Sequence, residues 1–230
     1  MIDKLFDLHC DTLTELYDKN ETLANNSCQV SLSHAAVWRQ WHQVFAIWSR
    51  PESSGEENYK RFWKVREAML PELQKGKQYG LTSYLAVEGG DLLCGSIERL
   101  DRLREAGVSI LTLVWAGKSC IGGAHDTDIG LTGFGADVVR HCFACGMIPD
   151  LSHASDAMFY EVVSMAKEAG KPVIASHSNC RSLCGHRRNL TDTMLRELFS
   201  LGGICGINLY PPFLSNGMST PETVADHILR

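Results

Sequence analysis

The sequence of 230 residues lacks the features that mark several common classes of protein. No stretch reaches the roughly 18 consecutive apolar residues that a membrane helix needs. The amino terminus has no basic segment followed by an apolar run and a small-residue cleavage site, so we expect a cytoplasmic protein with no membrane partner. Lys and Arg are scattered and the formal net charge is -5, which disfavours a nucleic-acid partner. A small-molecule substrate is expected instead.

Linkers and nucleotide-binding loops are also lacking. No Pro-, Gly- or Ser-rich linker divides the chain, which predicts a single domain over residues 1–230. No GxGxxG or Walker loop follows the first apolar run, and this disfavours nucleotide binding. The nine cysteines are an odd number in a chain too large to depend on disulfides, so reduced thiols are expected. Cys142 and Cys145 form a CxxC inside a helical pattern, where we expect neither a redox nor a metal role.

Short apolar runs alternate with longer segments of helical period, which is typical of repeated βα units and a parallel sheet. Several of the helical segments close on glycine, the usual residue after a helix. This alternation predicts either a (β/α) barrel or a doubly wound open sheet. The expected strands are residues 5–11, 43–49, 82–90, 108–116, 147–153, 172–178 and 203–210.

Side chains that can bind metals stand at the carboxyl ends of four of these strands, where a barrel carries its chemistry. His9 and Asp11 end the first strand, and residues two apart on a strand point the same way. The third, fifth and sixth strands end with Glu88, His153 and His177, respectively.

Each of these residues alone is more often a hydrogen-bonded or solvated side chain than a ligand. Together they are costly to bury unless a cation neutralises them. Three imidazoles and two carboxylates suit zinc or a similar divalent ion. They are too many for one tetrahedral zinc with an open position, so two metals bridged by Glu88 are expected.

The other histidines are weaker candidates. His125 lies in the Gly-rich segment GGAHDTDIG after the fourth strand and could reach the site. Four others are expected to be surface or packing residues, namely His34, His42, His141 and His227.

In combination, these motifs resemble the membrane (renal) dipeptidase family of zinc dipeptidases, within the amidohydrolase superfamily of metal-dependent (β/α) barrels. DLHCDT, LAVEGGDLL, DLSH, SHS, HRRN and GINLYPPFL follow in the family's order over nearly the whole chain. The resemblance implies a (β/α)8 TIM-type barrel that hydrolyses dipeptides, including those with a carboxyl-terminal D-residue. It implies two Zn2+ ions and a hydroxide shared between them as nucleophile. Related dipeptidases are often dimers, so a homodimer is the assembly that the resemblance suggests.

The resemblance also implies roles for individual residues. One zinc would be held by His9, Asp11 and Glu88. The other zinc would be held by Glu88, His153 and His177.

Two residues are matched to the family's substrate pocket. Arg188 would grip a substrate carboxylate with its planar guanidinium. Tyr210 matches a pocket tyrosine. Trp115 departs from the family pattern, because relatives carry His or a Trp-Asn pair near this strand end; substrate preference is therefore less firmly indicated than metal binding.

The family's proton-shuttling aspartate belongs to an eighth strand, in a segment resembling GSDFDG. Here residues 220–230 are a predicted helix, so we expect a barrel truncated after the seventh βα unit, with the catalytic aspartate beyond Arg230. Asp126, Asp128 and Asp150 are available carboxylates, but no motif places any of them as a substitute.

Two alternatives stay open. Another amidohydrolase, of the lactonase or deaminase type, would usually begin with HxH and bridge its metals through a carboxylated lysine; HxD with Glu88 argues against it. A catalytically impaired metal-binding relative or fragment is the other alternative.

The expected truncation predicts that the natural product is longer than these 230 residues. Intact mass spectrometry of the native protein should then give a value well above 25.5 kDa. A mass equal to 25.5 kDa would contradict the longer chain.

Overall fold

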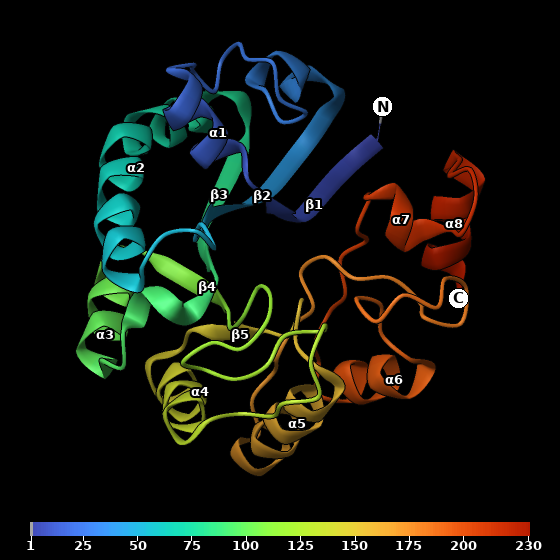
Figure 1. The fold of residues 1–230 in the computed structure, drawn as a ribbon. Coiled ribbons are helices and arrows are strands. Elements are labelled where there is room, and N and C mark those ends of the chain that lie inside the picture. The colour runs from blue at the N-terminus through green and yellow to red at the C-terminus, as the bar shows by residue number, and fades with distance from the viewer. Residues whose placement is uncertain (1) are drawn as a thin grey trace. The chain divides into compact units, whose positions relative to one another are not determined.

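The structure is a computed structural model that describes residues 2–230, with the side chains of residues 4–33 and 37–230. The side chain of His34, one of the weaker candidates, lies outside the described residues. The chain divides into two compact units, Met1–Ile110 and Leu111–Arg230. Figure 1 shows the elements of both units, coloured along the chain.

The first unit contains three parallel strands and the beginning of a fourth. The strands are β1 (Ile2–Cys10), β2 (Trp38–Trp48), β3 (Leu81–Glu88) and β4 (Val108–Thr112), and they are hydrogen-bonded in that order. The helices are α1 (Thr12–Lys19), α2 (Gly55–Gly76) and α3 (Ile97–Glu105), with the short 3-10 turns Leu32–Val37, Lys77–Tyr79 and Gly90–Leu93.

The core of the first unit lies between the strands and the helices α1 and α2. Five consecutive residues of β2 are buried, Gln43 to Ile47, because both faces of a parallel strand are covered. Helix α2 contributes Phe62 and Val65, which are almost fully buried. A polar tie joins helix and loop, since the backbone N–H of Leu23 donates to the buried Glu72 carboxylate at 2.9 Å.

An irregularity interrupts the pairing of β1 with β2. Phe6 pairs with His42, but Cys10 pairs with Phe45, so β1 carries one extra residue between Asp7 and Cys10. The backbone N–H of His9 donates to the Asp7 carboxylate at 3.1 Å. Such a bulge bends the strand and redirects the side chains within it, which here include His9.

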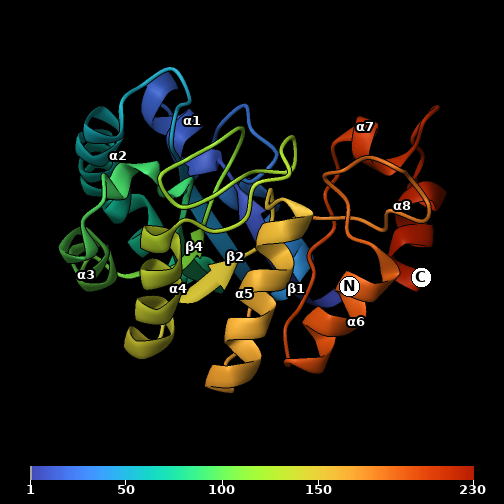
Figure 2. The same cartoon turned by 60° about the horizontal axis from the view of Figure 1, so that its bottom comes forward.

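The second unit begins inside β4 and continues with β5 (Ile148–Asp150), the next strand in the hydrogen-bonded order. Its helices are α4 (Gly133–Cys145), α5 (Asp156–Ala169), α6 (Asp192–Ser200), α7 (Pro211–Leu214) and α8 (Pro221–Leu229). Helices α4 and α5 pack against each other, as do α5 and α6 (Figure 2). Their buried faces include Val138, Val139, Phe159 and Val162.

The predicted sixth and seventh strands, residues 172–178 and 203–210, are not regular strands. Each is joined by a single parallel bridge, Asp150 to Ile174 and Ala175 to Cys205. The reason is local: the N–H of Ser176 donates to the Asp150 carboxylate, and the N–H of His177 donates to the Ser152 hydroxyl. Side chains thus take the positions that backbone partners would hold in a ladder, while the parallel direction is kept.

The α/β class with parallel βα units, as predicted, is confirmed. Among the described residues, no helix combines the length and the apolar character needed to cross a lipid bilayer.

Helix α2 begins with a reciprocal cap, which generates a stability prediction. The Ser54 hydroxyl accepts from the N–H of Glu57, and the Glu57 carboxylate accepts from the N–H of Ser54. Ser54→Ala should lower the free energy of unfolding by about 1 kcal/mol, measured by urea denaturation. Ser53→Ala is the matched control, because that hydroxyl does not cap the helix. Equal losses in the two variants would contradict a role for the cap.

Candidate metal centre

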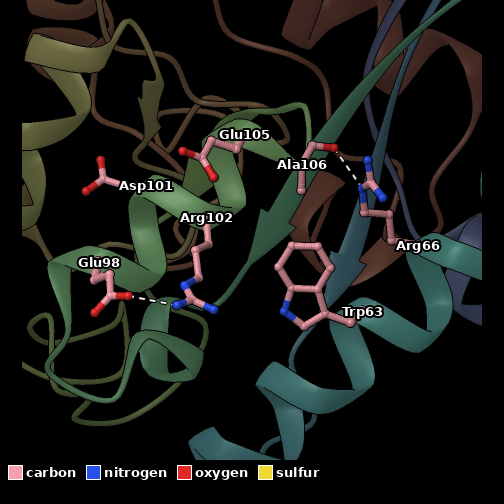
Figure 3. Close-up of a pocket in the computed structure, with 7 residues that line it drawn as sticks. All are labelled: Trp63, Arg66, Glu98, Asp101, Arg102, Glu105 and Ala106. Atoms are coloured by element: carbon pink, nitrogen blue, oxygen red, sulfur yellow. Dashed lines mark hydrogen bonds and ion pairs between the residues drawn. The ribbon is translucent and has the colours of Figure 1, made fainter.

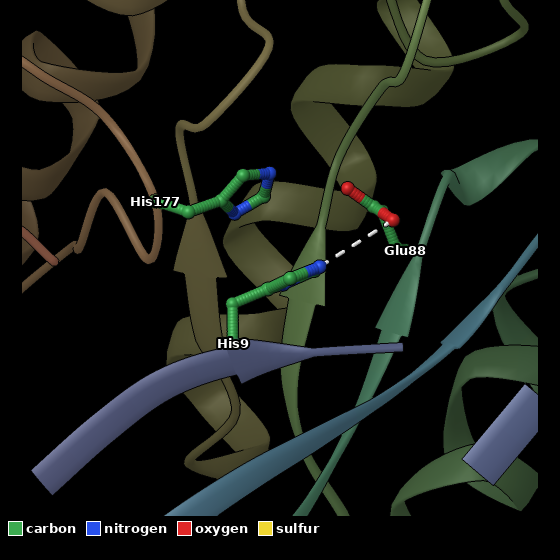
Figure 4. A group of neighbouring side chains, drawn as sticks. All are labelled: His9, Glu88 and His177. Atoms are coloured by element: carbon green, nitrogen blue, oxygen red, sulfur yellow. Dashed lines mark ion pairs between the residues drawn. The ribbon is translucent and has the colours of Figure 1, made fainter. Parts of the chain in front are cut away.

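The first unit brings together His9, Asp11 and Glu88, the amino-terminal cluster. Nε2 of His9 lies 3.4 Å from Asp11 Oδ1 and 3.6 Å from Glu88 Oε2. Figure 4 draws the contact between His9 and Glu88 as a dashed line. The side chain of Glu88 is only 3% exposed and that of Asp11 is 49% exposed. One imidazole thus lies between two carboxylates, one of which is buried.

Local backbone geometry positions these three side chains. Glu88 is the last residue of β3, and Gly89 follows it with a φ of 92°, a conformation in which a side chain would be strained. Asp11 was predicted as a strand residue but lies after β1, at the cap position of α1 with φ -92° and ψ 12°. Its carboxylate makes no capping hydrogen bond, so it is directed to His9 rather than to the helix. The predicted proximity of His9 and Asp11 is therefore found, although strand alternation is not its cause.

The second unit brings together His153 and His177, the carboxy-terminal pair. Their Nε2 atoms are 3.0 Å apart, with ring centroids at 5.0 Å. His153 has a φ of 71°, which non-glycine residues seldom adopt and which concentrates at functional sites. His177 lies in residues 172–178, the predicted sixth strand that is not regular in the structure. Its backbone N–H donates to the Ser152 hydroxyl.

The hydrogen bonds of the two rings determine which nitrogen carries the proton. Nδ1 of His153 is 2.8 Å from the carbonyl oxygen of Trp115, which can only accept, so this Nδ1 is the protonated one. Nδ1 of His177 is 2.7 Å from the Ser176 hydroxyl, whose own proton is directed to the Asp150 carboxylate at 2.6 Å. This Nδ1 therefore also donates. When the rings are neutral, each therefore presents the lone pair of Nε2.

Two lone pairs directed at one another across 3.0 Å repel unless a cation lies with them. Nitrogens bound to one tetrahedral zinc at about 2.0–2.1 Å would be about 3.3 Å apart, close to the observed separation. An Nδ1–H that donates to a fixed acceptor is also the usual arrangement of a histidine that binds metal through Nε2. The donor set thus fits a divalent cation.

Aromatic and polar groups of Trp115 and His125 lie close to His153. The ring of Trp115 lies 6.0 Å from it, and the backbone N–H of His125 donates to its carbonyl at 2.7 Å. The His125 ring is 5.8 Å from the His153 ring, and its buried Nδ1 has no hydrogen-bond partner among the described residues. The prediction that His125 could reach the site is compatible with this position.

The two predicted substrate-binding residues lie near a common aromatic ring. Arg188 is 2% exposed, donates to the Ser178 hydroxyl at 3.0 Å and lies 5.9 Å from the Phe213 ring. Tyr210 is 57% exposed and its ring is 4.9 Å from Phe213. Their roles toward a substrate stay predictions.

A groove between α2 and α3 is a different feature. It is lined by charged residues such as Arg66, Glu98 and Arg102 (Figure 3), and Arg66 donates to the carbonyl of Ala106 at 2.7 Å. Ala106 precedes β4, so the groove lies at the amino end of that strand, whereas Glu88 lies at the carboxyl end of β3. It contains none of the predicted ligands.

Comparison with known proteins identifies the family. The model of the family described as "Membrane dipeptidase (Peptidase family M19)" matches residues 57–229. The chain belongs to the membrane dipeptidase family. This confirms the resemblance drawn from the motifs.

Individual relatives of this membrane dipeptidase family member differ in length. An uncharacterized protein of Acinetobacter calcoaceticus is 32% identical over 158 residues, covering 65% of this chain and 49% of the relative. Mouse dipeptidase 3 is 37% identical over 156 residues, covering 64% of this chain and 31% of the relative. The matches thus span about half of the first relative and about a third of the second.

A solved structure shares the fold. A metallo peptidase from Rhodobacter sphaeroides, crystallised with a phosphinate mimic of the dipeptide L-Ala-D-Ala, superposes with a TM-score of 0.85 at 19% identity. The match covers 99% of this chain and 81% of that one. It supports the predicted (β/α) barrel type of fold.

Sequence reasoning missed the polar residues behind the carboxy-terminal pair. By sequence, Asp150 is one of three available carboxylates, and no motif singles out Thr112 or Ser176. The signal was present in the DLSH and SHS motifs, where polar residues stand inside otherwise apolar strands. Asp7, which binds the backbone of His9, was missed in the same way.

The surroundings of His125 predict a pH-dependent stability. Burial is the main reason that the pKa of His125 is lowered to about 4; the nearby Arg188 guanidinium, and the His153 ring when it is protonated, act in the same direction. Between this value and the ordinary pKa near 6.5, the unfolded state binds more protons than the folded state. The stabilisation is therefore complete above about pH 6.5 and is lost as the pH falls toward 4.

We expect a loss of about 1–2 kcal/mol over this window, after allowance for partial exposure of the ring. Urea unfolding of chelator-treated protein at pH 7 and pH 4.5 measures it, with His125→Gln as the comparison. An identical pH slope in the variant and the wild type would contradict this origin.

Proposed function

We propose that this chain carries the metal-binding and substrate-binding residues of a zinc-dependent dipeptidase, which hydrolyses the peptide bond of short peptides. The observation that carries the proposal is the 3.0 Å distance between Nε2 of His153 and Nε2 of His177. Membership of the membrane dipeptidase family supports the reaction class.

The proposed centre holds two divalent ions, as the resemblance to the family implies. His9, Asp11 and Glu88 would bind one ion, and Glu88 would be shared with the histidine pair. Each cluster stands at the carboxyl end of parallel strands, the end at which βα proteins place their chemistry. Glu88 suits the shared position because a buried carboxylate needs compensation by positive charge.

Peptide hydrolysis requires a nucleophile and a stabilised oxyanion. Two divalent ions, when bound, would supply both near neutral pH. Arg188 would hold the carboxylate of the dipeptide through its planar guanidinium. Tyr210 would line the pocket beside Phe213, from which its ring is 4.9 Å away. The neutral rings of His153 and His177 would hold their lone pairs in position through the bonds at Nδ1.

Dipeptides with a D-residue at the carboxyl end are included in the proposed substrate class. The L-Ala-D-Ala mimic bound to the Rhodobacter sphaeroides metallo peptidase supports this extension. The cytoplasm is the proposed location, supported by nine cysteines that are all free thiols. A homodimer is the proposed assembly.

The alternatives are a metal-binding relative without turnover and another type of amidohydrolase. A relative without turnover would bind zinc as tightly, because the same side chains are available. An amidohydrolase of the lactonase or deaminase type would act on cyclic esters or aminated rings. Activity on defined substrates separates the three.

Purified protein loaded with zinc should hydrolyse a panel of L,L and L,D dipeptides. Removal of the metal by a chelator should abolish turnover, and added zinc should restore it. His177→Ala should reduce kcat/KM by a factor of at least about 100, because both a ligand and its orientation are lost. Release of free amino acid, measured by chromatography, is the readout.

His141→Ala is the matched control, since this histidine of α4 lies outside both clusters. Full turnover by His177→Ala would reject the proposed centre. Stoichiometric zinc binding without turnover would favour the relative without activity, and cleavage of lactones in place of peptides would favour the other amidohydrolases.

A further inference from the structure

Behind His177 lies a buried group of hydroxyls around one carboxylate, which we call the Asp150 network. It comprises Asp150, Thr112, Ser152 and Ser176, each 3% exposed or less. None of the four is a predicted ligand. Buried polar groups of this kind are costly unless fully hydrogen-bonded, so their arrangement is informative.

Four donors converge on the two oxygens of Asp150. Oδ1 accepts from the backbone N–H of Ser152 at 2.9 Å and of Ser176 at 2.8 Å. Oδ2 accepts from the hydroxyls of Thr112 at 2.5 Å and Ser176 at 2.6 Å. This is the environment of an ionised carboxylate, which only accepts.

The direction of the hydrogen bond to His177 follows from this arrangement. Ser176 has one hydroxyl proton, which it donates in a hydrogen bond to the Asp150 carboxylate. At its 2.7 Å contact with His177 Nδ1, the Ser176 oxygen can therefore only accept, and the ring must donate from Nδ1. The lone pair of the ring is then confined to Nε2.

We propose that Asp150 is a positioning residue that selects the Nδ1–H tautomer of His177 through the Ser176 hydroxyl, and so keeps Nε2 available to a metal ion. The link to metal rests on the proposed function. The link to the tautomer does not, because it follows from hydrogen bonds within the second unit.

Asp150→Asn reverses the chain of donors while keeping the shape of the side chain. Two backbone N–H groups donate to Oδ1, so the amide oxygen must occupy that position and the amide nitrogen must replace Oδ2. The nitrogen then donates to Ser176, whose proton becomes available to His177 Nδ1. The ring is driven to the Nε2–H tautomer, in which Nε2 cannot bind a metal.

The first measurement uses metal-free protein. Nitrogen-15 NMR of the imidazole rings distinguishes a protonated nitrogen from one with a lone pair, and the His177 signals are assigned by their loss in His177→Ala. Wild type should show Nδ1–H at His177, and Asp150→Asn should show Nε2–H. Ser176→Ala, a second variant, should show a mixture because the selecting acceptor is gone.

The second measurement is zinc affinity by chelator competition. Asp150→Asn and Ser176→Ala should each weaken zinc binding by about 10–100-fold, the usual effect of removing a group that orients a metal ligand. Thr112→Val is the matched control: it removes a donor from the same Oδ2 but leaves the bond between Asp150 and Ser176 intact. It should keep the tautomer and the zinc affinity of wild type.

The inference is overturned if His177 keeps Nδ1–H in Asp150→Asn, or if this variant binds zinc as tightly as Thr112→Val. The proposed function fails separately. If wild type hydrolyses no dipeptide while the tautomer still reverses in Asp150→Asn, the role of Asp150 stands and the dipeptidase activity does not.

Discussion

The contact between Nε2 of His153 and Nε2 of His177, 3.0 Å apart, is the constraint around which the second unit is arranged. Two rings with their protons on Nδ1 would separate if nothing held them. They are held from behind, one by the carbonyl of Trp115 and the other by Ser176. In the neutral rings, a cation bound by both Nε2 atoms would relieve the repulsion between their lone pairs.

The same requirement accounts for the irregular backbone near the pair. A continuous ladder would give the N–H groups of Ser176 and His177 to a neighbouring strand. Here Asp150 and Ser152 accept these two N–H groups. The side chains that orient the His177 ring therefore also hold the backbone beside it. In the first unit, the Asp7 carboxylate accepts the backbone N–H of His9, and the extra residue of β1 interrupts the strand at the same place. In both units, regular secondary structure is interrupted next to a predicted metal ligand.

Much of this organisation is readable from the sequence, but not all of it. Glu88 was predicted to end its strand and does so, because an apolar run followed by Gly-Gly marks that boundary clearly. Asp11 was assigned to the strand by alternation, which fails once a bulge changes the register. Alternation concerns one strand at a time and carries no information about a carboxylate that replaces a backbone partner.

The role proposed for Asp150 could not be predicted from the sequence either. It depends on the direction of a hydrogen bond to Ser176, a residue 26 positions away. Residue types indicate which groups can donate, but only the geometry shows which proton goes where. The family, by contrast, was recognised from the order of short motifs, and the match over residues 57–229 confirms it.

If His153 binds a metal as proposed, its left-handed backbone restricts which residues could replace it as a ligand. At a φ of 71°, Asn and Asp are tolerated better than most residues, whereas branched side chains are strained. Replacement of His153 by an oxygen donor such as Asp or Asn would therefore strain the backbone less than replacement by most other residues. His177 lies under no such torsional restriction, so a shift toward a softer ligand set would meet less resistance there.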